Sequence, residues 1–187
     1  EDHLDRYDYK FENYIHSKFS ITKNQNEQDY FIYCQDDKVT MDYLYKANPK
    51  VQKIPMSYHQ KVSNGAYVEN QQIIIELNKN NFIMPISELQ IQGMHNSYNS
   101  MAAAISAKLV GVRNEKIRES LEDFKNLEHR LEFVATIKGI DFINDSKATN
   151  VNSTWYALES MTKPTVLIAG GVDKGNDYTL IKDLVNK

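Results

Sequence analysis

The densest group of side chains that could do chemistry lies at residues 144–150. This segment contains Asp, Ser, Lys, Thr and Asn side chains and directly follows an apolar stretch. Loops at the end of a strand carry binding and catalytic residues more often than packing residues. Asp145 can accept hydrogen bonds from ribose hydroxyls, Lys147 can neutralise a phosphate or a carboxylate, and Thr149 can donate near the start of a helix. The alternative is a polar turn in which Thr149 or Asn150 only caps the next helix.

A second cation, Lys174, lies in a glycine-flanked loop at residues 170–177. Two of the glycines are spaced as in a phosphate-binding loop, but the Lys-Ser or Lys-Thr pair of a Walker A sequence does not follow Gly175. Lys174 could still contact an anionic ligand with little steric obstruction. The alternative is a tight turn with a solvated lysine. We expect Lys174 and residues 144–150 to converge on one anionic ligand.

Asn96 and Asn99 stand three residues apart at the start of an alanine-rich helical segment. Side chains at that spacing can face one ligand, and their amides can offer donors and acceptors to a purine edge or a phosphate. The alternative is that they only cap the helix. Arg130 suits the bidentate holding of phosphate or ribose oxygens. A plain salt bridge from Arg130 to Glu128 or Glu132 is the simpler interpretation.

His3 lies between two aspartates near the start of the chain. Neutral imidazole is a common ligand of divalent ions, and Asp2 or Asp5 could orient it. A surface cluster is the simpler interpretation of these residues by themselves. Lys18, fifteen residues later, is by composition alone a solvated helix residue.

The elements that must position these residues follow from hydrophobic periodicity. We expect helices at residues 9–21, 42–47, 95 onward, 114–124 (with Asn114 as N-cap) and 151–161. We expect strands at residues 30–34, 73–77, 81–84, 131–137, 140–143 and 165–169. Residues 35–70 otherwise look polar and irregular. A strand, a glycine loop and a helix after residue 165 are typical of an α/β domain, and we expect a domain boundary near Asn126.

Composition sets the broad class. The 187 residues are 41% apolar and 25% charged, with a formal net charge of −3, so no basic excess favours nucleic acid as a partner. Cys34 is the only cysteine, which excludes an intrachain disulfide. No run of eighteen apolar residues and no charged-then-apolar leader occurs in this sequence, so we expect neither a membrane span nor a signal peptide. We therefore expect a cytoplasmic enzyme or binding protein.

Taken together and in this order, the motifs resemble the Mur ligase family over nearly the whole chain. Residues 144–150 are the most specific marker, because sister ligases and folylpolyglutamate synthases carry other residues after the equivalent strand. Within the family, the chain is most similar to the ligase that adds D-glutamate to UDP-N-acetylmuramoyl-L-alanine. The resemblance implies an ATP-dependent amide-forming enzyme of peptidoglycan synthesis, with ATP and magnesium as cofactors. The alternatives are a sister Mur ligase, a folylpolyglutamate synthase or a non-catalytic nucleotide-binding relative.

The resemblance also implies roles for individual residues. It places His3 and a carbamylated Lys18 at the magnesium site, and Asn96 and Asn99 around the adenine and nucleotide pocket. It places Arg130 and Asp145 on the ribose and phosphates of the nucleotide. On the substrate side it places Lys147, Thr149 and Lys174, of which Lys174 would contact the D-glutamate carboxylate. His129, beside Arg130, belongs to the motif between the domains of the family. Lys18 and Lys147 are the expected catalytic residues.

The implied fold is α/β. Residues 1–126 would form the C-terminal part of a central ATP-binding domain, and residues 127–187 the start of a Rossmann-like C-terminal amino-acid-binding domain. The family's Gly-Lys-Thr/Ser phosphate loop, its glutamate magnesium ligand and its UDP-binding domain would precede Glu1. We therefore expect the chain to be a fragment that does not turn over alone.

Overall fold

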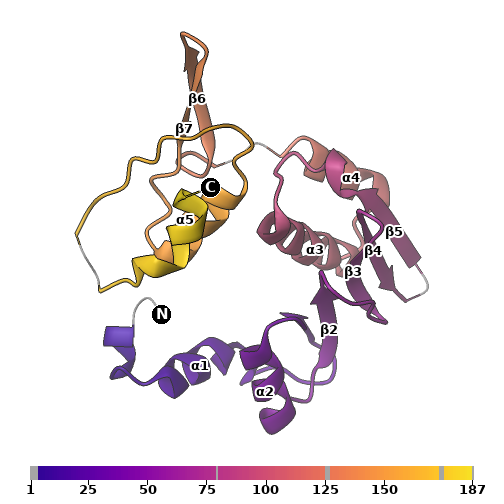
Figure 1. The fold of residues 1–187 in the computed structure, drawn as a ribbon. Helices are drawn as coiled ribbons and strands as arrows, with labels where there is room; N and C mark the ends of the chain where they lie inside the picture. Colours follow the sequence, from indigo (N-terminus) through magenta and orange to yellow (C-terminus); the bar gives the residue numbers. More distant parts are fainter. Residues whose placement is uncertain (1–3, 79, 125–126, 173–174, 187) are drawn as a thin grey trace. The chain divides into compact units, whose positions relative to one another are not determined.

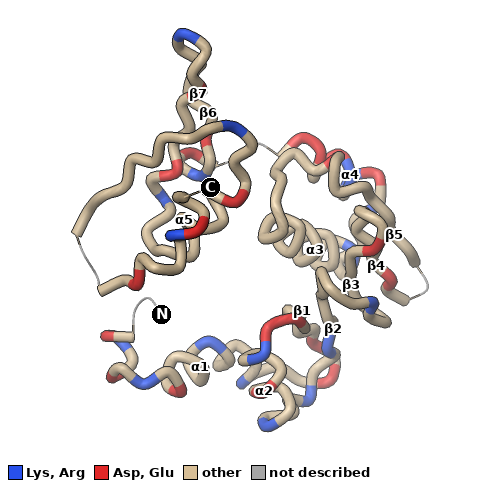
Figure 2. The backbone as a smooth tube through the Cα atoms, viewed as in Figure 1, with Lys and Arg blue, Asp and Glu red and all other residues tan. Residues whose placement is uncertain are grey.

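The computed structural model describes residues 4–78, 80–124, 127–172 and 175–186, and the chain divides into two compact units (Figure 1). The first unit is Glu1–Phe124 and the second is Lys125–Lys187. Helices and strands occur in both, which confirms the α/β class expected from the sequence. None of the helices within these described ranges is long and apolar enough to cross a membrane. Figure 2 shows acidic and basic residues interspersed along each unit.

The first unit is built on a five-stranded mixed sheet with strands in sequential order. The strands are β1 (Tyr30–Cys34), β2 (Gln52–Ser57), β3 (Gly65–Glu69), β4 (Gln72–Leu77) and β5 (Asn80–Pro85). The pairs β1–β2 and β2–β3 are parallel, whereas β3–β4 and β4–β5 are antiparallel. Alternate side chains of β4 are buried, as the period of two in a strand requires. Ile73 and Ile75 thus lie opposite Met84 and Phe82 of β5.

Among the described residues of the first unit, four helices and three short 3-10 turns accompany the sheet. The helices are α1 (Phe11–Phe19), α2 (Lys38–Ala47), α3 (Met94–Leu109) and α4 (Asn114–Glu122), and the turns are η1 (Leu4–Tyr7), η2 (Ser20–Thr22) and η3 (Ile86–Glu88). α3 contacts β1 to β4 and packs its buried Met101, Ala104 and Ile105 against the sheet. The small alanine and serine side chains of α3 allow this close approach. The core therefore lies between α3 and the sheet.

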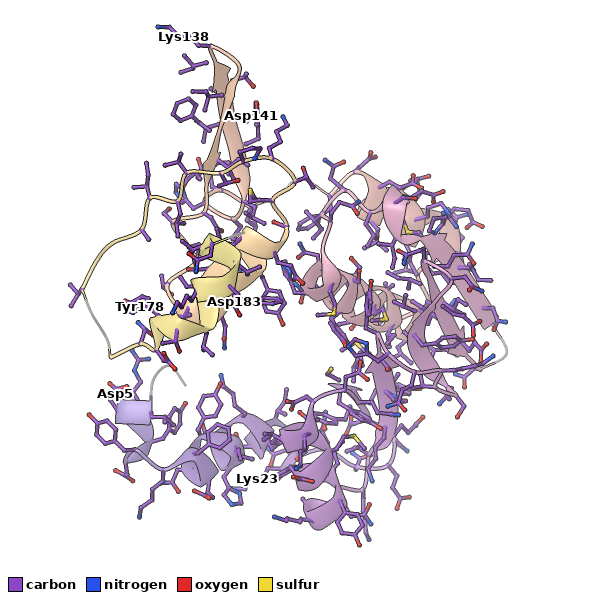
Figure 3. All side chains as sticks on the ribbon, viewed as in Figure 1. Asp5, Lys23, Lys138, Asp141, Tyr178 and Asp183 are labelled. Carbon is purple, nitrogen blue, oxygen red and sulfur yellow. The ribbon has the colours of Figure 1, made fainter. Side chains whose placement is uncertain are left out.

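The second unit contains a hairpin and short helices. Its elements are β6 (Glu132–Ile137), β7 (Ile140–Asn144), α5 (Val151–Glu159), η4 (Tyr178–Ile181) and α6 (Lys182–Val185). The two-residue hairpin loop is Lys138–Gly139, and Figure 3 shows Lys138 at the hairpin tip. Both loop residues have positive φ, 52° and 80°, as a type I′ turn requires. The predicted hairpin is therefore confirmed.

Three expectations about secondary structure were wrong. The region at residues 35–70 is not irregular, because it contains β2 and β3 as well as α2. β2 contains Pro55. Because proline has no N–H to donate to the ladder, its presence argued against a strand at this position in the sequence. Asn114 does not cap α4: Arg113 holds that position, and Asn114 instead donates to the Asn81 carbonyl (3.2 Å) and accepts from Lys108 (2.8 Å).

The apolar run at residues 165–169 is the third error, since the structure has no strand there. Val166 and Ile168 are 89% and 94% exposed. A strand exists only through ladder hydrogen bonds to a neighbour. In the described part of the second unit, the one sheet is the two-stranded pair β6–β7, which does not include this run.

Asp37 caps α2, because its side chain accepts a hydrogen bond from the Thr40 N–H (2.8 Å). We expect Asp37→Ala in the full-length protein to lower the free energy of unfolding by about 1 kcal/mol, since one N–H of the first turn loses its acceptor. Chemical denaturation measures the change. Asp42→Ala, at an exposed position in the same helix, is the matched control and should change stability by less than about 0.5 kcal/mol. Equal effects of the two variants would contradict the capping role.

Candidate functional site

The start of α3 holds the two asparagines that the sequence singled out. α3 follows Gly93, whose φ of 100° lies in the region that favours glycine. Asn96 donates from its side-chain amide to the Gln92 carbonyl (2.8 Å), and Asn99 donates to the Asn96 side-chain oxygen (3.4 Å). The N-cap residue of α3 is Gly93, and no side chain caps the helix. The alternative that the asparagines merely cap α3 is therefore wrong, and their amides lie side by side.

A carboxylate that no motif in the sequence singled out anchors this helix start. Asp36, two residues after β1, accepts hydrogen bonds from the Ser57 hydroxyl (2.6 Å) and the Tyr58 N–H (2.7 Å). Its second oxygen, which takes the Tyr58 bond, also accepts from the Tyr98 hydroxyl of α3. An acidic residue directly beyond an apolar strand was the signal that could have drawn attention to it.

These hydrogen bonds define the protonation states at the anchor. Burial would raise the pKa of Asp36, but the hydrogen bonds from Ser57, Tyr98 and Tyr58, with the nearby His59, outweigh it and lower that pKa. Burial, followed by the hydrogen bond to Asp36, raises the pKa of Tyr98 far above its ordinary value. Asp36 is therefore ionised and Tyr98 protonated at neutral pH, so the tyrosine is the donor.

Lys18 is exposed in the last turn of α1. Its Nζ lies 5.3 Å from the centre of the Tyr14 ring, and the residue lines an open hollow of about 270 Å³ with Tyr33 and Cys34. No group of three or more His, Cys, Asp or Glu side chains suited to a metal ion occurs among the described residues. His3, the other expected ligand, lies outside them. An unmodified lysine ammonium does not suit magnesium, which takes oxygen ligands.

In the second unit, hydrogen bonds bring two of the predicted segments together. The Leu131 N–H donates to the Asp145 carboxylate (3.1 Å), and the Lys147 N–H donates to the His129 carbonyl (3.1 Å). His129 and Leu131 both have positive φ, 69° and 45°, which is uncommon for residues with side chains. The loop that carries Arg130 is thus held against the loop that carries Lys147.

Side chains of the hairpin ends reinforce this arrangement. Asn144 lies 2.8 Å from His129 Nδ1 and donates to the Glu132 carboxylate (3.2 Å), which also accepts from the His129 N–H (2.9 Å). Sequence reasoning did not identify these contacts of Asn144 and Glu132. Arg130 and Lys147 are both exposed next to this network. Two cations on adjacent loops can hold an anionic ligand such as a phosphate.

The remaining predicted residues have different outcomes. Asn150 caps α5 by accepting from the Ser153 N–H (2.8 Å), as the capping alternative foresaw. Thr149 is exposed just before that helix. Lys174 lies outside the described residues, so its convergence with residues 144–150 stays a prediction.

Comparisons with known proteins identify the family. A model of the Mur ligase middle domain matches residues 1–107. The chain is 55% identical over 186 residues to UDP-N-acetylmuramoylalanine--D-glutamate ligase of Christiangramia forsetii, and 52% identical to the protein of the same name from Bacteroides fragilis. Each alignment covers 100% of this chain and 42% of the relative, so the chain spans about two fifths of their length.

Solved structures show the same fold. MurF from Acinetobacter baumannii aligns with a TM-score of 0.66 at 21% identity, covering 84% of this chain and 34% of that one. A pseudomurein peptide ligase type C from Methanothermus fervidus aligns with a TM-score of 0.63 at 19% identity, covering 87% and 39%. The resemblance carried by the sequence motifs is confirmed: the chain belongs to the Mur ligase family.

Proposed function

We propose that this chain is part of an ATP-dependent ligase that adds D-glutamate to UDP-N-acetylmuramoyl-L-alanine in peptidoglycan synthesis. The observation that carries the proposal is the 55% identity, over the whole of this chain, to a ligase that is named for this reaction. The hydrogen-bonded loops that present Arg130 and Lys147 support it, because the substrates and ATP are anions. We place the enzyme in the cytoplasm, where ATP and nucleotide-linked precursors are found.

We assign the two parts of the chain different tasks. Residues 1–126 supply the C-terminal part of the central ATPase domain, and residues 127–187 the first part of the amino-acid-binding domain. In the first, Asn96 and Asn99 hold the nucleotide through their adjacent amides. The second contributes three groups: Arg130 and Asp145 hold ribose and phosphates, Lys147 and Thr149 lie on the substrate side, and Lys174 meets the D-glutamate carboxylate.

The chemistry that fits these groups is acyl-phosphate formation. The γ-phosphoryl group of ATP passes to the L-alanine carboxylate, and the D-glutamate amine then attacks the acyl carbon. The tetrahedral intermediate expels phosphate and leaves an amide. Magnesium, when bound, neutralises charge on the phosphates. Lys147 stabilises negative charge that develops on the transferring group and on the substrate carboxylate.

Phosphate release by the full-length protein tests the assignment, because this chain spans 42% of the length of its relatives. With ATP, magnesium and UDP-N-acetylmuramoyl-L-alanine present, we expect D-glutamate to stimulate release at least about tenfold more than glycine or L-lysine. Release that is no faster with D-glutamate than with those amino acids would exclude the substrate assignment. Preference for another amino acid would identify a sister ligase or a polyglutamate synthase. ATP binding with no release would indicate a non-catalytic relative.

A further inference from the structure

Asp36 and Tyr98 connect the carboxyl end of β1 to the first turns of α3. The residues are 62 positions apart in the chain, yet the Tyr98 hydroxyl donates directly to the Asp36 carboxylate. The bond is charge-assisted, and such bonds are about twice as strong as neutral ones. It therefore joins the helix start to the sheet edge at one defined point.

The Asp36 end of this connection is rigid. Its carboxylate also accepts from the Ser57 hydroxyl and the Tyr58 N–H, and Ser57 is fully buried at the end of β2. Ser57 in turn accepts from the N–H groups of His59 (3.1 Å) and Gln60 (2.9 Å). The carboxylate is thus held by two parallel strands and the turn after the second. A side chain with so many partners has little freedom to follow a moving helix.

At the other end, Tyr98 sits between the two asparagines in sequence but on another side of the helix. Successive residues of an α-helix are rotated by about 100°, so Tyr98 is turned about 200° from Asn96 and about 100° from Asn99. Tyr98 is half-buried, with its ring 6.1 Å from that of Tyr58, whereas Asn99 is exposed. Because Tyr98 is held at the sheet edge, the rotation of α3 about its axis is fixed. The directions in which the Asn96 and Asn99 side chains leave the helix are therefore fixed as well.

Apolar packing leaves this rotation less defined at the helix start. The large buried side chains of α3, Met101 and Ile105, lie one to two turns further along. The buried residues of the first turns are Ser97 and Ser100, which are small, and the N-cap is a glycine with no side-chain cap. Beyond these residues, the Tyr98 ring packs against the core cluster, and its hydroxyl adds the hydrogen bond to Asp36. That bond is directional, so it fixes the orientation of this end more narrowly than apolar contact alone.

We propose that Asp36 and Tyr98 are positioning residues for nucleotide binding, which hold the first turns of α3 so that Asn96 and Asn99 meet the nucleotide together. The proposal rests on the assignment of these asparagines to the nucleotide in the proposed function. The pair acts through the asparagines and does not contact the reacting atoms. Its loss weakens nucleotide binding and leaves the affinity for the amino acid unchanged.

Tyr98→Phe in the full-length protein tests the proposal, because it removes one hydroxyl and keeps the ring. We expect the Kd and the KM for ATP to rise about fivefold, with kcat and the KM for D-glutamate within about twofold of wild type. Calorimetry measures the Kd, and phosphate release gives the kinetic constants. Tyr67→Phe is the matched control: it also removes a tyrosine hydroxyl that donates to a carboxylate, that of Glu76 (3.0 Å), but on strands β3 and β4. The control should leave all these constants unchanged.

Three outcomes would overturn the proposal. The first is an ATP Kd within twofold of wild type in Tyr98→Phe. The second is a parallel rise in the KM values of all substrates, which indicates a general loss of structure. The third is a failure of Tyr98→Phe to fold while Tyr67→Phe folds, because the bond would then hold the domain rather than the asparagines. If the wild-type protein lacks D-glutamate-dependent release, the proposed function fails, and the calorimetric Kd still decides the role of the pair.

Discussion

Replacing Lys18 by arginine in the full-length protein is expected to lower D-glutamate-dependent phosphate release by about 100-fold, which corresponds to about 2.7 kcal/mol of transition-state stabilisation. The resemblance to the family implies that Lys18 reacts with carbon dioxide to form a carbamate. That adduct is an anion whose oxygens suit magnesium, whereas the free ammonium repels it. Arginine keeps the positive charge and does not form the adduct, so the variant isolates the chemical change from the loss of a long side chain.

Lys23→Arg is the control for this substitution. Lys23 is an exposed lysine shortly after α1 and is labelled in Figure 3. Its replacement should leave the rate within about twofold of wild type, as is usual for exposed residues outside a site. A near-normal rate in Lys18→Arg would show that a cation is sufficient at this position, and the carbamate assignment would be wrong.

Lys147→Ala in the same protein is expected to reduce turnover at least about tenfold, on the order of 1.4 kcal/mol. The hydrogen bond from the Lys147 N–H to His129 holds this loop beside Arg130, so the loss of the side chain removes charge without removing the loop contact. The same effect is expected for Lys174→Ala. Steady-state phosphate release with saturating ATP measures both.

Lys163→Ala provides a matched control in the same unit. Lys163 forms an exposed ion pair with Asp141 (2.7 Å), which is labelled in Figure 3. Exposed pairs of this kind contribute little to stability, so this variant should retain the wild-type rate. Near-normal rates in both Lys147→Ala and Lys174→Ala would remove these lysines from the site.

Local signals in the sequence were sufficient for several elements. β1 was expected at residues 30–34 and has these bounds, because its apolar run is flanked by polar residues on both sides. The Lys138–Gly139 turn follows from the need for two residues with positive φ in a two-residue hairpin. The helix expected at residues 114–124 exists as α4, although its first residue, Asn114, had been assigned as the cap.

Contacts between distant residues account for what the sequence did not reveal about the site. The bond between Asp36 and Tyr98 spans 62 residues, and no periodic pattern encodes such a pairing. The contacts of Asn144 with His129 and Glu132 likewise form only once the hairpin is closed. That the segments with polar motifs form the site stays a prediction, whereas the structure shows the side chains that hold some of these segments in place.

By itself, the sequence determined the family, the α/β class and most helices and strands, because these depend on motif order and on hydrophobic periodicity over a few residues. Only the tertiary structure decided that β2 is a strand despite Pro55 and that residues 165–169 are not. The physical reason is that a strand is stabilised by its neighbours: β2 lies between β1 and β3, while residues 165–169 have no ladder partner within the described part of the second unit.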